Sequence, residues 1–127
     1  MSAGPCVLVV DDNAINLEIC QEILEQEFTV FTASNAREAI QRAQQHQPQI
    51  VLLDVMLPGV DGLEICRRLR QLPEMRLARI IMVSAKAMLS ERTAGMDAGA
   101  DAYLTKPFDY DDLLAAIHGQ AVAPRKP

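Results

Sequence analysis

Short unbroken runs of aliphatic residues alternate along this chain with longer stretches in which apolar residues recur at helical spacing. Three runs are wholly apolar and mostly β-branched, at residues 7–10, 50–53 and 80–83. Such runs are typical of strands that are covered on both faces. Residues 29–33 and 102–105 mix polar and apolar side chains, as strands with one wetter face do. We therefore predict three central strands and two edge strands.

Amphipathic helices are predicted after each of these strands. The apolar stripes expected to face the core in the first two helices are Ile15, Ile19, Cys20, Ile23 and Leu24, and then Ala36, Ala39, Ile40 and Ala43. Asn35 and Glu38 form a capping pair at the start of the second helix. The other helices are predicted at residues 61–72, at residues 89–98 before Gly99, and after Asp109.

Strands that alternate with helices imply a parallel sheet with right-handed crossovers and helices on both faces. With the two mixed strands at the edges, the strand order becomes 2-1-3-4-5, which is the flavodoxin-like, doubly wound (βα)5 sandwich. Ligands of such sheets bind at the carboxyl ends of the strands, beside the switch point between strands 1 and 3. We expect residues 1–119 to form the domain, and residues 120–127 to be a tail or the start of a linker.

Composition narrows the class of protein further. The chain has 127 residues, half of them apolar, and carries 12 basic against 17 acidic side chains for a net charge of −5. This charge argues against direct nucleic-acid or anionic-membrane binding by this domain, and no run approaches the length of a membrane span. Cys6, Cys20 and Cys66 are too scattered for a disulfide framework or a zinc site. With no signal-like start, we expect buried thiols in a cytoplasmic protein.

Polar side chains follow several of the predicted strands. Asp11 and Asp12 follow the first strand, Asp54 the third, Ser84 the fourth and Lys106 the fifth. Parallel strands bring their carboxyl ends to one edge of the sheet, so these side chains should converge. Three carboxylates at one place repel one another unless a cation is present. Their oxygens suit a hard ion, and Mg²⁺ in particular because it combines carboxylates with phosphate.

Four sequence stretches carry a family resemblance. They are VVDDN at residues 9–13, LDVMLPGVDG at residues 53–62, SA at residues 84–85 and GADAYLTKPF at residues 99–108. Together they resemble the receiver domain of two-component response regulators, the CheY-like family, and the resemblance extends to about Gly119. The roles described next are what that resemblance implies, checked against the chemistry of each residue.

The resemblance makes Asp54 the phosphoryl acceptor. The donor is a phosphohistidine on a histidine kinase or a histidine phosphotransfer protein. Mg²⁺, with Mn²⁺ as a substitute, would be bound by Asp11, Asp12, Asp54 and the backbone carbonyl of Met56. An ionised carboxylate is a competent nucleophile, and phosphoryl transfer needs positioning and charge neutralisation above all. The domain is then no enzyme beyond catalysing its own phosphorylation and slow dephosphorylation.

Three further residues take part in phosphate binding and switching by the same resemblance. Lys106 would pair with the phosphoryl oxygens, and the Ser84 hydroxyl would donate a hydrogen bond to one of them. A shift of Ser84 would let the aromatic side chain of Tyr103 rotate inward. This motion changes the face built from the fourth helix, the fifth strand and the fifth helix, so a local charge event biases a two-state element.

The resemblance also implies roles for five residues in the lifetime of the phosphoryl group and in docking of the phosphodonor. Met56 and Lys86 occupy positions that tune phosphate lifetime in the family, and the apolar Met56 offers nothing to orient water, so we expect slow hydrolysis. Ile15, Pro107 and Phe108 are candidate contacts for the phosphodonor. Ile15 has an equal alternative as a core residue on its helical stripe.

The partners expected are the phosphodonor and a downstream output domain or protein. The fifth helix lacks Lys and Arg, which the family's dimerising DNA-binding regulators carry there, so we expect a monomer or a weak phosphorylation-dependent dimer. A phosphatase of the haloacid dehalogenase type needs an aspartate where Met56 stands. The rival left open is a receiver-like interaction module that acts without phosphorylation.

Overall fold

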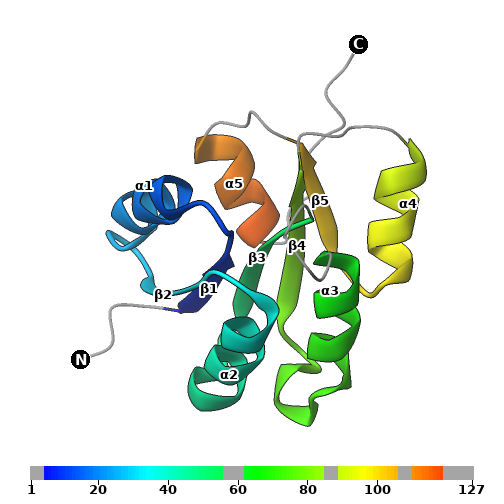
Figure 1. Ribbon diagram of the computed structural model, residues 1–127. Helices are drawn as coiled ribbons and strands as arrows, with labels where there is room; N and C mark the ends of the chain where they lie inside the picture. Colours follow the sequence, from blue (N-terminus) through cyan, green and yellow to red (C-terminus); the bar gives the residue numbers. More distant parts are fainter. Residues whose placement is uncertain (1–4, 56–61, 85–88, 106–109, 119–127) are drawn as a thin grey trace.

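The computed structural model of this chain describes residues 5–55, 62–84, 89–105 and 110–118. Within them a single sheet is formed by the strands β1 (Cys6–Val10), β2 (Thr29–Ala33), β3 (Ile50–Asp54), β4 (Arg79–Ser84) and β5 (Ala102–Thr105). All pairings are parallel, and the order is β2-β1-β3-β4-β5 (Figure 1). The predicted fold class is therefore confirmed.

Helices connect the strands as the sequence predicts. In the described part of the chain they are α1 (Ala14–Leu24), α2 (Ala36–His46), α3 (Gly62–Gln71), the 3-10 turn η1 (Pro73–Met75), α4 (Leu89–Asp97) and α5 (Tyr110–Ile117). The predicted start residues Asp61 and Asp109 lie outside the described residues. None of the helices in the described ranges is both long and apolar enough to cross a membrane.

The start of α2 shows the predicted capping pair. The Asn35 side chain accepts a hydrogen bond from the backbone N–H of Glu38 at 2.9 Å. The Glu38 carboxylate in turn accepts hydrogen bonds from the backbone N–H of Ser34 at 2.8 Å and from its hydroxyl at 3.0 Å. These bonds hold the pKa of Glu38 below its usual value. Asn35 thus satisfies a backbone donor that the helix leaves unpaired, and Glu38 fixes Ser34, the residue before the cap.

The helices cover the sheet from both faces. In Figure 1, α1 and α5 lie on one face, and α2, α3 and α4 lie on the other. Leu52 of β3 packs in one buried cluster with Leu24 of α1 and Leu113 of α5. Its neighbour Leu53 points to the opposite face and packs in a second cluster with Ile65 of α3. This double coverage explains why the central strands are continuous apolar runs.

The two mixed strands lie at the edges, as predicted. All five residues of β3 are buried, whereas four of the five in β2 and two of the four in β5 are only partly buried. Partial exposure at an edge allows polar side chains such as Thr29 and Thr105 to reach water. Edge strands therefore contain polar residues among apolar ones, whereas the central strand β3 is apolar up to its last residue.

Helix α1 corrects one prediction. Ile15, Ile19 and Ile23, which were expected to face the core, have exposed fractions of 66%, 49% and 39%. Cys20 and Leu24 of the same predicted stripe do turn toward the core, together with Leu17. The first turn of the helix is held at the sheet edge, where the Asn16 amide donates a hydrogen bond to Asp11. The isoleucine stripe therefore faces outward.

The cysteines correct a second prediction in part. Cys66 in α3 is fully buried, and burial raises the pKa of its thiol to about 11. Cys6 and Cys20 are only partly buried, so the expectation of buried thiols is right for Cys66 and wrong for these two. All three lie in the described part of the chain, and none forms a disulfide.

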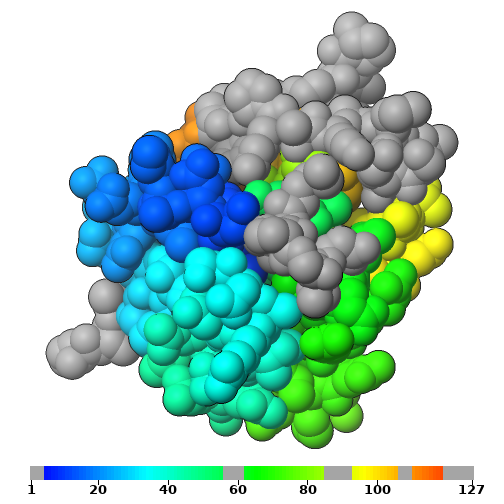
Figure 2. Space-filling view, viewed as in Figure 1, coloured from blue at the N-terminus to red at the C-terminus, as the bar shows by residue number. Residues whose placement is uncertain are grey.

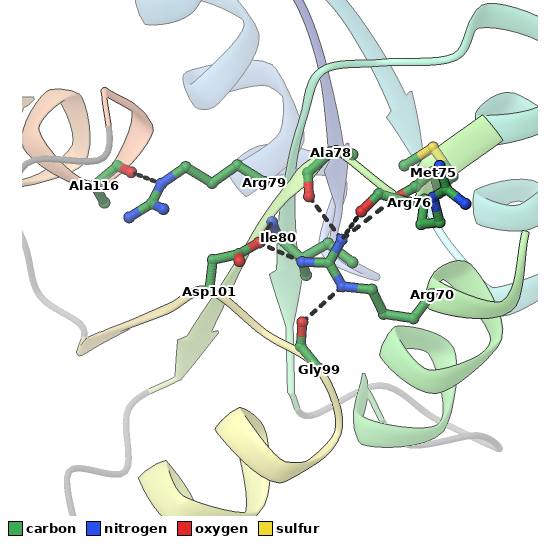
Figure 3. Close-up of polar contacts among 9 residues, drawn as sticks. All are labelled: Arg70, Met75, Arg76, Ala78, Arg79, Ile80, Gly99, Asp101 and Ala116. Atoms are coloured by element: carbon green, nitrogen blue, oxygen red, sulfur yellow. Dashed lines mark hydrogen bonds and ion pairs between the residues drawn. The ribbon is translucent and has the colours of Figure 1, made fainter. Parts of the chain in front are cut away.

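An arginine joins three segments at the amino end of the sheet (Figure 3). Arg70, near the end of α3, donates from Nε to the carbonyl of Gly99 and from Nη1 to the carbonyl of Ala78, each at 2.7 Å. Nη1 also donates to the carbonyl of Met75 at 3.2 Å, and Nη2 forms an ion pair with Asp101. We call these five residues the Arg70 clamp. It fixes α3 to the loops that lead into β4 and β5.

Gly99 allows the Arg70 clamp to close. Its φ of +109° lies in a region that favours glycine. A Cβ at this position would lie 2.7 Å from Cγ of Arg70, so a side chain would collide with the arginine stem. Asp101 completes the arrangement, because the carboxylate oxygen that meets Arg70 also accepts the backbone N–H of Ile80 at 2.8 Å.

Candidate functional site

Three buried polar residues stand at the carboxyl edge of the sheet. Asp11 directly follows β1, Asp54 ends β3 and Ser84 ends β4. Their exposed fractions are 7%, 8% and 1%. β1 pairs with β3, and the chain continues to opposite sides from these two strands, so Asp11 and Asp54 flank the topological switch point. The structure thus places these residues at the edge that the sequence indicates.

The acidic residues converge as the sequence predicts. Asp11, Asp12 and Asp54 each contribute a carboxylate oxygen, and the three oxygens lie within 4.8 Å of one another. Asp12 is exposed, while the other two are buried. Like charges this close in a partly dehydrated place repel one another, and a cation removes that repulsion.

The loop after β1 holds Asp11 in place. The backbone N–H of Asn13 donates to Oδ1 of Asp11 at 3.0 Å, and the Asn16 amide donates to Oδ2 at 3.3 Å. Asn13 is also the N-cap of α1, where its side chain accepts the backbone N–H groups of Ile15 and Asn16 at 2.9 and 3.1 Å. Helix α1 and the Asp11 carboxylate are therefore oriented together. The role of Asn16 was not predicted, and its position five residues after Asp11, in the first helical turn, is the signal for it.

Gly62 lets α3 begin directly against the end of β3. A Cβ on Gly62 would lie 2.4 Å from the carbonyl oxygen of Asp54 and 2.7 Å from Cα of Val55. Its backbone N–H donates to the carbonyl of Val55 at 2.9 Å. No side chain fits in this contact, and this role of Gly62 was not predicted. The signal was the glycine eight residues after the aspartate that ends a strand.

Tyr103 lies on the strand beside Ser84. Tyr103 pairs in register with Met82, two residues before Ser84, so strand alternation puts the Tyr103 and Ser84 side chains on the same face of the sheet. Tyr103 has an exposed fraction of 9% and belongs to the buried cluster on that face. A Cβ on Gly95 of α4 would lie 3.1 Å from the tyrosine ring, so the helix backbone approaches the ring closely.

The remaining predicted site residues divide into two groups. Ile15 is exposed in the first turn of α1, so its alternative as a core residue is wrong. The other positions lie outside the described residues and keep their roles as expectations only: Met56, Lys86, Lys106, Pro107 and Phe108.

The site has the properties that a divalent cation requires. Its three carboxylates supply hard oxygen ligands on one side, and Asp12 is exposed so that water can complete the coordination. Mg²⁺ keeps several waters and binds through few protein carboxylates together with phosphate oxygens. The donor set therefore fits Mg²⁺. No sulfur or imidazole belongs to the three-residue acidic group.

Comparison with known proteins gives a consistent result. The family model described as the response regulator receiver domain matches residues 7–118. The chain is similar to the phosphate regulon transcriptional regulatory protein PhoB of Rhizobium meliloti, with 41% identity over 87% of this chain and 48% of that protein. The chain spans about half the length of the curated relatives it matches.

Solved structures agree with the fold. The receiver domain of a sensor histidine kinase from Pseudomonas aeruginosa, with a magnesium ion coordinated in its active site cleft, is 28% identical. It matches with a TM-score of 0.82 over 91% of this chain and 95% of that one. A response regulator from Burkholderia pseudomallei, with a phosphorylated aspartic acid, a calcium ion and citrate, is 28% identical. It matches with a TM-score of 0.83 over 89% of this chain and 66% of that one.

Proposed function

Because this chain belongs to the receiver domain family of response regulators, we propose that it accepts a phosphoryl group on Asp54. The donor is the phosphohistidine of a histidine kinase or a histidine phosphotransfer protein. The observation that carries the proposal is the position of Asp54, buried at the end of β3 and within 4.8 Å of the carboxylates of Asp11 and Asp12.

The chemistry is a single displacement at phosphorus. A carboxylate oxygen of Asp54 forms the new O–P bond as the N–P bond to the donor imidazole breaks, and the released imidazole keeps the electron pair of that bond. Asp11 and Asp12 would hold Mg²⁺ together with Asp54, and the bound ion supplies neutralisation of the phosphoryl charge. The hydrogen bonds from Asn13 and Asn16 support this role because they orient the Asp11 carboxylate before the ion binds.

Two solved relatives support the proposal by analogy. The Burkholderia pseudomallei regulator carries a phosphorylated aspartic acid, and the Pseudomonas aeruginosa receiver domain holds a magnesium ion in its active site cleft. By the family resemblance, the Met56 carbonyl would join the cation ligands and Lys106 would pair with the phosphoryl oxygens. Mn²⁺ would replace Mg²⁺, since it prefers the same oxygen ligands.

Ser84 and Tyr103 would transmit the phosphorylated state. Both side chains face the same side of the sheet from neighbouring strands, and Tyr103 packs against α4 at Gly95. Movement of the Ser84 hydroxyl toward the phosphoryl group would then alter the packing of Tyr103, and with it the surface of α4, β5 and α5. A Ser84→Ala variant should accept phosphate yet show smaller backbone NMR shifts in β5 than the parent. Equal shifts would contradict this role.

The partners follow from the same proposal. Ile15, exposed near the site, would contact the phosphodonor together with Pro107 and Phe108. An output domain or protein would read the switch, which agrees with relatives about twice as long as this chain. The domain would catalyse only its own phosphorylation and slow dephosphorylation, at a rate tuned by Met56 and Lys86.

Intact-mass spectrometry tests the central step. Incubation with acetyl phosphate and Mg²⁺ should add one phosphoryl group to the parent chain and none to Asp54→Asn, because an amide oxygen is a poor nucleophile. The matched control is Asp97→Asn on α4, an exposed acid, which should be modified as the parent is. A phosphoryl adduct on Asp54→Asn would overturn the assignment. A folded, Mg²⁺-binding parent that refuses every donor would favour a phosphorylation-independent interaction module.

A further inference from the structure

The strand β2 lies at the edge of the sheet, and among the described strands it pairs only with β1. The backbone N–H of Thr29 donates to the carbonyl of Pro5 at the start of this pairing. In a parallel pair every second residue bonds to the neighbouring strand, so Val30 and Thr32 direct their N–H and C=O groups away from β1. We call these outward backbone groups the outer edge of β2.

The sequence of β2 favours pairing with a further strand. Residues 28–33 are FTVFTA, in which aromatic and β-branched side chains dominate, and no Asp, Glu, Lys, Arg, Pro or Gly occurs in residues 28–36. Uncharged segments of this composition pair readily with other chains when their edge is open. The other edge strand, β5, is shorter and has Asp101 and Lys106 next to it in sequence. Protection of β2 must therefore come from outside the strand.

Helix α2 supplies side chains at this edge. Nε of Arg42 donates to the carbonyl of Thr32 at 3.3 Å, so the guanidinium occupies the place where the N–H of an added strand would lie. One helical turn later, His46 stacks on Phe31, with ring centroids 3.7 Å apart and an interplanar angle of 9°. Figure 2 shows α2, in cyan, at the surface beside α1, in blue. The exposed Arg42 thus brings a charge to an uncharged strand.

We propose that Arg42 covers the outer edge of β2 and that, without it, this edge pairs with the same edge of a second copy. The pairing is antiparallel about Phe31, so Val30 of one copy lies opposite Thr32 of the other, and the two exchange hydrogen bonds. Such an arrangement is two-fold symmetric and uses the outer edge of both copies, so it closes as a dimer. In the parent chain each Arg42 would have to give up its carbonyl, and two cations would come to one edge, which disfavours the dimer.

Sedimentation velocity over a wide concentration range tests this role of Arg42. Arg42→Ala should associate at least about tenfold more tightly than the parent, because backbone hydrogen bonds form at an edge that no longer carries a charge. Its mass should approach twice the 14.0 kDa of one chain. The experiment uses neither a phosphodonor nor Mg²⁺, so its failure would leave the proposed phosphoacceptor function untouched.

Arg37→Ala is the matched control. Arg37 is exposed in the first turn of the same helix, so this variant loses the same charge from α2 while Arg42 remains on the strand edge. It should associate no more tightly than the parent. Association of Arg37→Ala as strong as that of Arg42→Ala would show a general effect of charge, and would overturn the proposal.

Thr32→Pro separates pairing at this edge from association elsewhere. The N–H of Thr32 points outward, so proline removes no bond to β1, and proline is tolerated on the outer side of an edge strand. Combined with Arg42→Ala, it should return association to the level of the parent, because the edge can no longer pair with a strand. Circular dichroism would verify that all variants are folded. A folded double variant that associates as Arg42→Ala does would overturn the proposal.

Amide hydrogen exchange locates the contact without a second substitution. In concentrated Arg42→Ala, the N–H groups of Val30 and Thr32 should exchange more slowly than in a dilute sample, because they become bonded to the second copy. The N–H of Phe31, whose residue pairs with Leu8 of β1, should change little. Association of Arg42→Ala no tighter than that of the parent, growth beyond two chains, or unchanged exchange at Val30 and Thr32 would each overturn the proposal.

Discussion

The two ends of the sheet handle charge in opposite ways. At the carboxyl end, Asp11, Asp12 and Asp54 bring three like charges together. At the amino end, the Arg70 guanidinium meets backbone carbonyls and the Asp101 carboxylate, with the Arg70 side chain only 21% exposed. Among the described residues, the carboxyl end gathers acids that fit a cation, whereas the amino end surrounds a guanidinium with acceptors. Under the proposed function the first end serves chemistry, and the contacts of Arg70 suit the second end to stability.

This difference predicts opposite responses to the removal of charge. At the amino end, loss of a charged group leaves partners without their hydrogen bonds, which destabilises the fold. At the carboxyl end, loss of the exposed Asp12 should relieve repulsion and stabilise the fold as long as no cation is present.

Removal of the Arg70 guanidinium should have the largest effect. Arg70→Met keeps the apolar stem but leaves the carbonyls of Gly99 and Ala78 without this donor and Asp101 without its ion-pair partner. We expect a loss of about 3 kcal/mol in the free energy of unfolding, measured by urea denaturation. Arg67→Met is the control. Among the described residues the 52% exposed Arg67 pairs with the exposed Glu64, so this substitution should cost less than about 0.5 kcal/mol. Equal losses in the two variants would show that the Arg70 clamp adds no stability.

A side chain at Gly99 should cost somewhat less. Gly99→Ala combines an unfavourable φ with a Cβ placed 2.7 Å from Cγ of Arg70, and we expect a loss of about 2 kcal/mol. In an Arg70→Ala background the collision is gone and only the backbone strain remains, so the same substitution should cost about half as much. Strict additivity of the two changes would show that the arginine stem and Gly99 do not compete for space.

Alkaline pH should lower the free energy of unfolding through ionisation of Cys66, which lies in α3 with Arg70. Burial raises the pKa of the thiol to about 11 in the folded chain, against 9.0 for an ordinary cysteine. The thiol keeps its proton in both states below pH 9.0, so stability is full there. As the pH rises from 9.0 toward 11 the unfolded chain loses this proton first, and the free energy of unfolding falls. Between about pH 8 and pH 10 the parent should lose about 1 kcal/mol that a Cys66→Ala variant does not lose.

Urea denaturation at each pH measures this difference. Cys20→Ala leaves Cys66 in place and should keep the pH dependence of the parent. A Cys66→Ala variant with that same dependence would show that ionisation of this thiol is not coupled to unfolding.

Removal of an acid at the carboxyl end should give the smallest effect, and of opposite sign. With EDTA present, Asp12→Asn should raise the free energy of unfolding by about 0.5 kcal/mol, since it removes one of three neighbouring negative charges. Asp101→Asn, the same change at the other end, should lower it. With Mg²⁺ present, the parent should gain stability and Asp12→Asn should gain less. A destabilised Asp12→Asn in EDTA would contradict the contrast between the two ends.

The sheet and its acidic edge could be predicted because they depend on local patterns. A strand covered on both faces must be apolar throughout, so residues 50–53 indicated a central strand. Asp54 then stands at its carboxyl end by position alone, and the parallel topology brings Asp11 beside it. The hydrogen bond from Asn16 to Asp11 could not be predicted, because it depends on the rotation of α1 about its axis.

The face of α1 and the Arg70 clamp could not be predicted. Two apolar stripes run along α1, and helical spacing alone does not say which one meets the sheet. Arg70 stands beside Arg67 and Arg68 in the same short segment, and its partner Asp101 lies 31 residues further along the chain. Only the folded arrangement distinguishes these three arginines. Periodicity reports what an element can bury, whereas contacts distant in sequence decide what it does bury.

The spacing of the Arg70 clamp along the chain also bears on how the domain folds as it is synthesised. Arg70 leaves the ribosome well before Gly99 and Asp101. Its partners lie 29 and 31 residues downstream, so α3 cannot form these contacts until they have been synthesised. The strands β1, β2 and β3 all precede Arg70 and can assemble first. We therefore expect the half of the sheet formed by β4 and β5 to be fixed last, once Asp101 can pair with the guanidinium. A nascent chain halted before Gly99 should therefore be digested by protease near η1, whereas the completed chain should resist.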